Sequence, residues 1–79
     1  MNLIATQWKD FESGLKIEVA NIDSDGNFLF AVRNSFGDVI NKSGEFEHEP
    51  LPSARDDDFI KRCRYTTFNE AANQLENAL

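Results

Sequence analysis

The segment from Leu15 to Ile22 alternates, with Leu15, Ile17 and Val19 on one side of the chain. Apolar side chains at every second position are separated by Lys16 and Glu18, so one face of this segment is apolar and the other polar. Such a period of two is typical of a half-buried β-strand. The next segment, residues 23–27, is rich in Asp, Asn and Gly, which tolerate positive φ and close hairpins. We therefore expect a strand that ends in a hairpin turn.

Two further strands are predicted at short intervals after this turn. Residues 28–33 place two Phe and one Val on a common face. A second turn is expected over residues 34–37, and a third strand over residues 38–42. Gly44 breaks or bulges this third strand before residues 45–47. Antiparallel strands joined by such short turns form a β-meander.

The C-terminal segment has the pattern of an amphipathic helix. Thr67 can cap the helix, and Glu70 stands three residues later, which completes a capping box. Apolar side chains then recur at helical spacing, which predicts an apolar stripe that packs on the sheet. The stripe consists of Phe68, Ala71, Ala72, Leu75, Ala78 and Leu79.

The segment between the meander and this helix is predicted as a loop followed by an ambiguous element. Pro50 and Pro52 exclude a central strand or a helix interior over residues 48–58. Residues 59–65 alternate as a fourth strand would, but Phe59, Ile60 and Cys63 also fit one side of a short helix. We favour the strand, because Tyr and Thr at the end of this segment prefer extended backbone.

Near the N-terminus the pattern is irregular. Leu3, Ile4, Trp8 and Phe11 are apolar without a clean period, and they fit a short strand or a helical turn. A chain of 79 residues is one domain, residues 1–79. The expected fold class is α+β, with an antiparallel β-meander of three to four strands packed against one C-terminal amphipathic helix.

The charge balance excludes several classes of partner. The net charge is −6, from 14 acidic and 8 basic residues. Nucleic acids and anionic membranes bind mainly through Lys and Arg, so neither is favoured as a partner. A basic protein surface is the partner that this charge would attract.

Cysteine use and the first residues indicate the compartment. Cys63 is the only cysteine, so the chain has no internal disulfide to stabilise a secreted domain of this size. Residues 1–6 contain neither a basic leader region nor a long apolar run. We expect a cytoplasmic protein, and the absence of a Gly-rich phosphate loop or a zinc-ligand pair predicts no cofactor.

Two acidic stretches were weighed as metal sites. Asp23, Asp25 and Asn27 resemble the start of a calcium loop, but Gly26 is fourth rather than sixth and no Glu occupies the twelfth position. The triplet over residues 56–58 would need an irregular backbone to direct three consecutive carboxylates at one ion. A hairpin turn and a solvated loop or acidic helix start explain the two stretches better, so no metal is expected.

The charge within the second half of the chain is unevenly distributed. Residues 45–58 carry six acidic residues against Arg55, a local charge of −5, whereas residues 59–66 carry a charge of +3. This pattern has two interpretations, namely internal pairing of the two stretches and a surface that docks on a basic partner. The leading functional hypothesis is a non-enzymatic protein-interaction module. Its candidate binding residues are Glu45, Glu47, Glu49, Asp56, Asp57 and Asp58.

Two other functions remain as alternatives. A small enzyme or ligand-binding protein could use Cys63 as a nucleophile with His48 as its base. A single-stranded nucleic-acid binder could use Arg62, Arg64 and Tyr65, the last by stacking on a base. The open strand edges of a meander also permit two copies to pair as a homodimer.

In its size, its charge and the order of its elements, the chain resembles small accessory proteins of phages and mobile elements, including some anti-CRISPR inhibitors. The resemblance rests on these global properties alone. It implies an inhibitor that acts by binding another protein.

Overall fold

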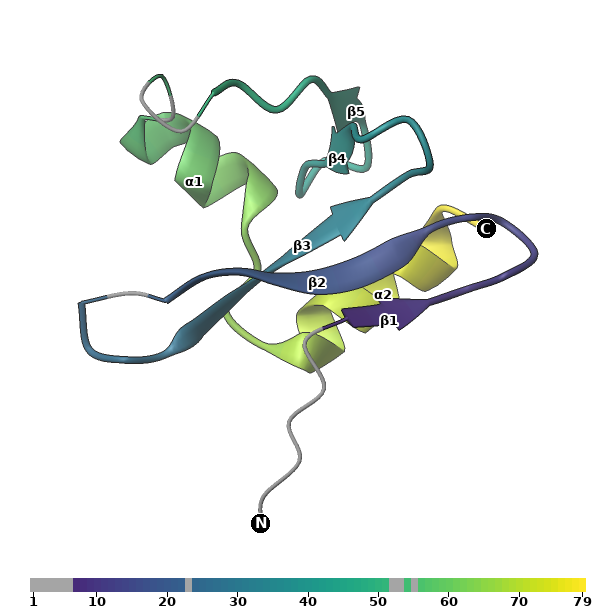
Figure 1. Ribbon diagram of the computed structural model, residues 1–79, viewed down its shortest axis with the longest axis horizontal. Helices are drawn as coiled ribbons and strands as arrows, with labels where there is room; N and C mark the ends of the chain where they lie inside the picture. The colour runs from purple at the N-terminus through teal and green to yellow at the C-terminus, as the bar shows by residue number, and fades with distance from the viewer. Residues whose placement is uncertain (1–6, 23, 52–53, 55) are drawn as a thin grey trace, which may run out of the picture.

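A computed structural model describes residues 7–22, 24–51, 54 and 56–79 (Figure 1). Five strands form one antiparallel sheet in the order β1-β2-β3-β4-β5, so each strand pairs with its neighbour in the sequence. The strands are β1 (Gln7–Lys9), β2 (Lys16–Ile22), β3 (Phe28–Arg33), β4 (Val39–Ile40) and β5 (Phe46–Glu47). The helices are α1 (Asp57–Cys63) and α2 (Phe68–Asn77). The predicted α+β class, with a meander and a C-terminal helix, is confirmed.

The β2–β3 hairpin is the centre of the sheet. Ile17 pairs with Val32 and Glu18 with Ala31, and the register shifts at a bulge between Val19 and Asn21. The bulge lies near the end of β2, before the predicted hairpin turn over residues 23–27. Asp23 of that turn lies outside the described residues. On the outer side of β2, the irregular N-terminal segment supplies the short strand β1 at Trp8, and Phe11 lies in the turn that follows it, where the Gly14 N–H donates to the Asp10 carbonyl at 3.0 Å. Leu3 and Ile4 lie outside the described residues.

The segment predicted as a third strand forms a second small hairpin. β4 and β5 pair antiparallel, and the turn between them ends at Gly44, whose φ is +86°. The Asn41 side-chain oxygen accepts hydrogen bonds from the backbone N–H groups of Ser43 and Glu45, at 2.9 and 3.0 Å. Asn therefore closes the turn with its own side chain, as is common for this residue. Gly44 thus lies in the turn between two strands and does not bulge a strand.

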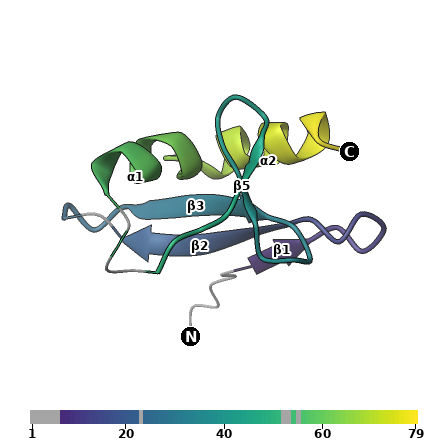
Figure 2. The ribbon, with the colours of Figure 1, turned by 90° about the horizontal axis from the view of Figure 1, so that it is seen from above.

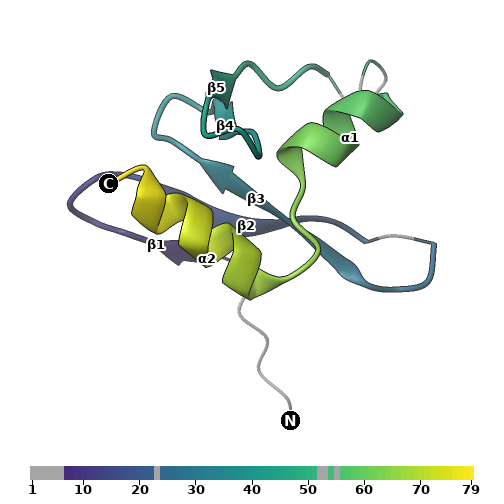
Figure 3. The same ribbon diagram turned by 180° about the vertical axis from the view of Figure 1, so that it is seen from behind.

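Each helix packs on its own apolar cluster. Consecutive residues of β3 point to opposite sides of the strand, and Val32 belongs to the cluster under α2 whereas Ala31 belongs to the cluster with α1. α2 lies across β2 and β3 as a second layer, as Figures 2 and 3 show. Its predicted apolar stripe is buried at Ala71 and packed at Leu75, but Leu79 lies beyond the helix end and is exposed.

The preference for a strand over residues 59–65 is wrong, because most of this segment is helical. Asp56 caps α1 by accepting a hydrogen bond from the Phe59 N–H at 2.8 Å. Acidic residues in the first turn and basic residues in the last turn both stabilise the helix, because their charges are opposite to those of the helix dipole at each end. Phe59 and Cys63, four residues apart, are the two buried side chains of α1. Extended backbone begins only after the helix, where Tyr65 exchanges two backbone hydrogen bonds with Phe30.

The capping box predicted for α2 is half formed. The Thr67 hydroxyl accepts a hydrogen bond from the Glu70 N–H at 3.1 Å, as expected. The Glu70 carboxylate instead accepts a hydrogen bond from the hydroxyl of Thr66, at 3.3 Å. The described residues form two helices, α1 and α2. Neither helix is long and apolar enough to cross a lipid bilayer.

Candidate functional site

The acidic segment, residues 45–58, runs along one margin of the molecule from β5 to the start of α1 (Figure 1). Residues 52, 53 and 55 within it lie outside the described residues. Its six acidic residues fall into two groups by exposure. Glu47 and Glu49 are partly buried, whereas Glu45, Asp56, Asp57 and Asp58 are exposed.

Glu47 connects β5 to helix α1. Its carboxylate accepts hydrogen bonds from Arg62 Nε and Nη2 at 3.0 and 2.9 Å, and from Asn41 Nδ2 at 2.7 Å. These hydrogen bonds lower the pKa of Glu47 from its ordinary value of 4.5 to about 2, and the bond from Arg62 has the largest effect. Glu47 is therefore a carboxylate whose charge is already matched within the molecule.

Glu49 is held between two arginines. One of its oxygens accepts a hydrogen bond from Arg64 Nη2, and the other lies 3.1 Å from Arg33 Nη2. Burial by itself would raise the pKa of Glu49, but the hydrogen bond and charge of Arg64 and those of Arg33 outweigh it and lower the pKa. Glu49 thus joins α1 to the central strand β3.

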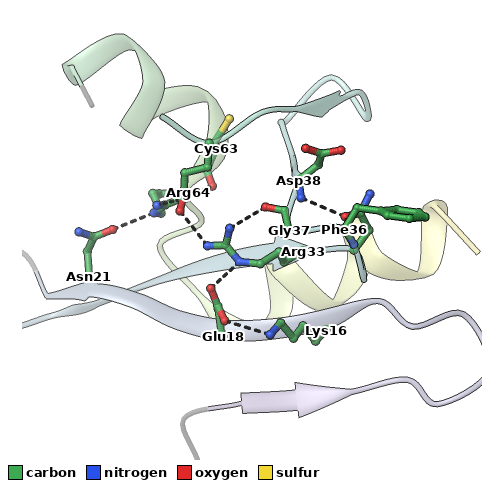
Figure 4. Close-up of polar contacts among 11 residues, drawn as sticks. Lys16, Glu18, Asn21, Arg33, Phe36, Gly37, Asp38, Cys63 and Arg64 are labelled. Carbon is green, nitrogen blue, oxygen red and sulfur yellow. Dashed lines mark hydrogen bonds and ion pairs between the residues drawn. The ribbon is translucent and has the colours of Figure 1, made fainter. Parts of the chain in front are cut away.

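Arg64 is the buried member of this network. Only 2% of the residue is exposed, and its Nε donates to Asn21 Oδ1 at 2.8 Å (Figure 4). Its guanidinium also lies 5.3 Å from the centre of the Phe59 ring, a cation–π distance. The network therefore links the acidic segment, β2, β3 and the end of α1 in one connected set of ion pairs.

The interpretation of internal pairing holds for part of the acidic segment. Under this interpretation the triplet over residues 56–58 would fold back on the basic stretch, but Glu47 and Glu49 make those pairs instead. Asp57 and Asp58 form no ion pair with any other described residue, and they project from the first turn of α1. Part of the negative charge therefore remains open to solvent.

Two apolar side chains of the same segment were missed as candidate binding residues. Leu51 is 76% exposed and Phe46 is 49% exposed. The signal in the sequence was their position, since both lie inside the acidic segment rather than in an apolar run. We define the acidic margin as the exposed described residues Glu45, Phe46, Leu51, Asp56, Asp57 and Asp58.

The structure does not bring Cys63 and His48 into contact. Cys63 is fully buried, and its Sγ lies 3.5 Å from Glu47 Oε2. Burial, and then the Glu47 carboxylate, raise the pKa of the Cys63 thiol to about 11, so the thiolate is scarce near neutral pH. His48 is 91% exposed in its side chain, and its Nδ1 lies 3.9 Å from Asp38 Oδ1.

Two of the residues considered for nucleic-acid binding are buried. Arg64 is engaged in the ion-pair network, and Tyr65 is 3% exposed. The Tyr65 hydroxyl donates to the backbone oxygens of Ile40 and Asn41, at 3.0 and 3.1 Å. Tyr65 therefore has no free ring face on which a base could stack. Within the described part of the chain, no group of three or more His, Cys, Asp or Glu side chains is placed to hold a metal ion.

Comparison with protein-family models, with curated proteins and with solved structures gave no match for this chain. The class of protein is therefore defined by the fold alone. It is a small α+β domain in which a five-stranded antiparallel meander carries two helices.

Proposed function

We propose that this protein is a non-enzymatic interaction module that binds a basic surface of another protein through the acidic margin. The single observation that carries the proposal is the exposure of Leu51 in a segment whose Asp57 and Asp58 carboxylates are exposed and form no ion pair with another described residue. Protein interfaces commonly combine apolar anchors with a polar, charged rim. The acidic margin has both parts on a chain whose net charge is −6.

In this proposal some acidic residues bind the partner and others hold the backbone in place. Glu45, Asp57 and Asp58 are exposed and free to meet lysine and arginine side chains of a partner. Glu47 and Glu49 hold the segment against α1 and β3 through their arginine pairs. These pairs fix Glu47 and Glu49, and residues that are fixed before binding lose less entropy on binding, which raises the affinity.

The chemistry of the partner follows from the sign of the charge. A basic protein surface is attracted over a Debye length, and the attraction increases the association rate at low salt. Basic surfaces of this kind are typical of proteins that bind nucleic acids. A small acidic module that covers such a surface would act as an inhibitor of that protein.

The test is affinity capture from a lysate with matched variants. The acidic-margin variant Asp57→Asn/Asp58→Asn removes two charges but keeps Asp56, because Asp56 caps α1. The control Glu12→Gln/Glu76→Gln removes two charges from exposed residues elsewhere. A third variant, Leu51→Ser, removes the apolar anchor without a change of charge.

The proposal predicts one basic protein that is captured by the native chain and by the control. Capture should fall about tenfold or more with each of the other two variants, since a central anchor or a matched charge pair contributes about 1–2 kcal/mol. Equal capture by all variants, or equal loss in the control, would contradict the proposal. Circular dichroism of each variant checks that the fold is retained.

A further inference from the structure

Three basic residues lie in register across the first three strands of the sheet. Lys9 of β1 pairs with Lys16 of β2, and Lys16 pairs with Arg33 of β3. Directly paired residues project to the same side of a sheet. We call Lys9, Lys16 and Arg33 the basic row.

The basic row lies on the sheet face opposite to α2. The adjacent paired residues Trp8, Ile17 and Val32 belong to the apolar cluster under α2. Side chains alternate between the two faces of a strand, so the basic row faces away from that helix. The row therefore lies on the sheet face that α2 leaves uncovered, where the side chains of Lys16 and Arg33 are 29% and 14% exposed.

Like charges at directly opposed positions of a sheet are destabilising, and here they are only partly neutralised. The Glu18 carboxylate lies 3.7 Å from Lys16 Nζ and 2.6 Å from Arg33 Nε (Figure 4). Glu49 also contacts Arg33, but it is shared with Arg64. Lys16, Arg33 and Arg64 thus share two carboxylates, and Lys9 forms no ion pair with another described residue, so the row carries a net positive charge on an acidic protein.

Beside the row lies a hollow of about 240 Å³ between two turns. Its lining includes the basic row, Ser35 and the glycines Gly14 and Gly37, and no carboxylate of the described residues lines it. The nearest acidic side chain along the chain, Asp10, is turned into its own loop, where it accepts two hydrogen bonds from Ser13. The hollow therefore has a positive wall and a hydroxyl group.

Arg33 is fixed in place before any ligand binds. Its Nε donates to Glu18, its Nη1 to the Gly37 carbonyl at 2.9 Å and its Nη2 to Glu49. The ammonium of Lys9 is different, because no carboxylate of the described residues lies within 4 Å of it and it sits 5.7 Å from the centre of the Phe11 ring. A preorganised guanidinium and a free ammonium are suited to hold an oxyanion.

We propose that the basic row binds a phosphate group, with Lys9 and Lys16 contacting its oxygens, Arg33 supplying a fixed positive charge and Ser35 donating a hydrogen bond. A phosphate anion is attracted by the net positive charge of the row and relieves the repulsion along it. The phosphate can be free or carried by a small molecule. Phe11 and Phe36, each 87% exposed on the two flanking turns, could stack on the base of a nucleotide.

The test is a titration with inorganic phosphate near neutral pH, followed by amide NMR shifts at constant ionic strength with chloride as the balancing salt. The variant Lys9→Gln/Lys16→Gln removes two cations of the row. The control Lys42→Gln/Lys61→Gln removes two exposed lysines elsewhere. The row variant should keep its fold, since it relieves like-charge repulsion, and the dispersion of its spectrum checks this.

The proposal predicts saturable shifts confined to residues 9–16 and 33–37. Affinity should fall about tenfold or more in the row variant, because two charge-assisted contacts are lost, and should be unchanged in the control. Shifts that do not saturate, or that are equal in both variants, would overturn it. A second titration with a nucleoside monophosphate identifies the source: tighter binding with shifts at Phe11 and Phe36 indicates a nucleotide, and equal affinity indicates phosphate alone.

Discussion

Arg62 and Arg64 show how differently two neighbouring arginines of one charged stretch are used. Both pair with a glutamate of the acidic segment, Arg62 with Glu47 and Arg64 with Glu49. The Arg62 side chain is 49% exposed, whereas that of Arg64 is 1% exposed. A pair in water gains little, but a buried charge that loses its partner is costly.

This contrast predicts unequal losses of stability. Arg64→Ala should lower the free energy of unfolding by about 3–5 kcal/mol, because Glu49 then loses a buried cationic partner and a cavity opens beside Phe59. Arg62→Ala should lower it by about 0–1 kcal/mol, as is usual for an exposed pair. Urea unfolding followed by circular dichroism measures both. Equal losses would show that the burial of Arg64 does not govern its contribution.

At the scale of the elements, α1 depends on its first turn. The helix is seven residues long, and isolated helices of this length are unstable in water. Its stability comes from the Asp56 cap, from charges that suit its dipole and from the burial of Phe59 and Cys63. Because Cys63 has this structural position, the helix gives no support for a reactive thiol.

The cap predicts a difference between neighbouring aspartates. Asp56→Ala should destabilise the protein by about 1 kcal/mol, since the Phe59 N–H loses its acceptor. Asp58→Ala, two residues further along the chain, should lower the free energy of unfolding by only about a few tenths of a kcal/mol, because it removes a charge that favours the helix dipole. Thermal unfolding of the two variants under identical conditions distinguishes them, and a larger effect at Asp58 would show that the cap is not at Asp56.

At the scale of the whole molecule, charge is segregated although the chain is acidic. The acidic margin follows the segment from β5 to α1, and the basic row crosses β1, β2 and β3. The ion-pair network of Glu49 with Arg33 and Arg64 connects the two regions. Two surfaces of opposite sign on one small domain permit two ligands of opposite charge.

The network also predicts how global stability depends on pH. The pKa of Glu47 is about 2 in the folded protein and close to 4.5 when the chain is unfolded. As the pH falls, Glu47 therefore binds a proton in the unfolded state before it does so in the folded state. The contribution of Glu47 to the free energy of unfolding is complete above about pH 4.5 and is lost as the pH falls toward 2. Unfolding by urea at a series of pH values should show a smaller acid loss for Glu47→Gln than for the native protein. The control Glu45→Gln, at an exposed residue, should follow the native protein, and parallel curves for all three would contradict the assignment.

The sequence alone determined the features that depend on neighbouring residues. The alternation from Leu15 to Ile22 is sufficient for β2, because period two places one apolar face against a core. The cap at Thr67 and the spacing after it are sufficient for α2 for the same local reason. The acidic segment was also visible, since charge along a chain needs no fold to be counted.

Only the tertiary structure decided which charged side chains face each other and whether residues 59–65, before α2, form a strand or a helix. Residues 59–65 fit the period of a strand and that of a short helix, and the burial of Phe59 and Cys63 beside Ala31 decided for the helix. Lys9, Lys16 and Arg33 are far apart in the chain, and strand register alone aligns them. Local patterns specify local backbone, whereas burial and register depend on contacts between distant segments.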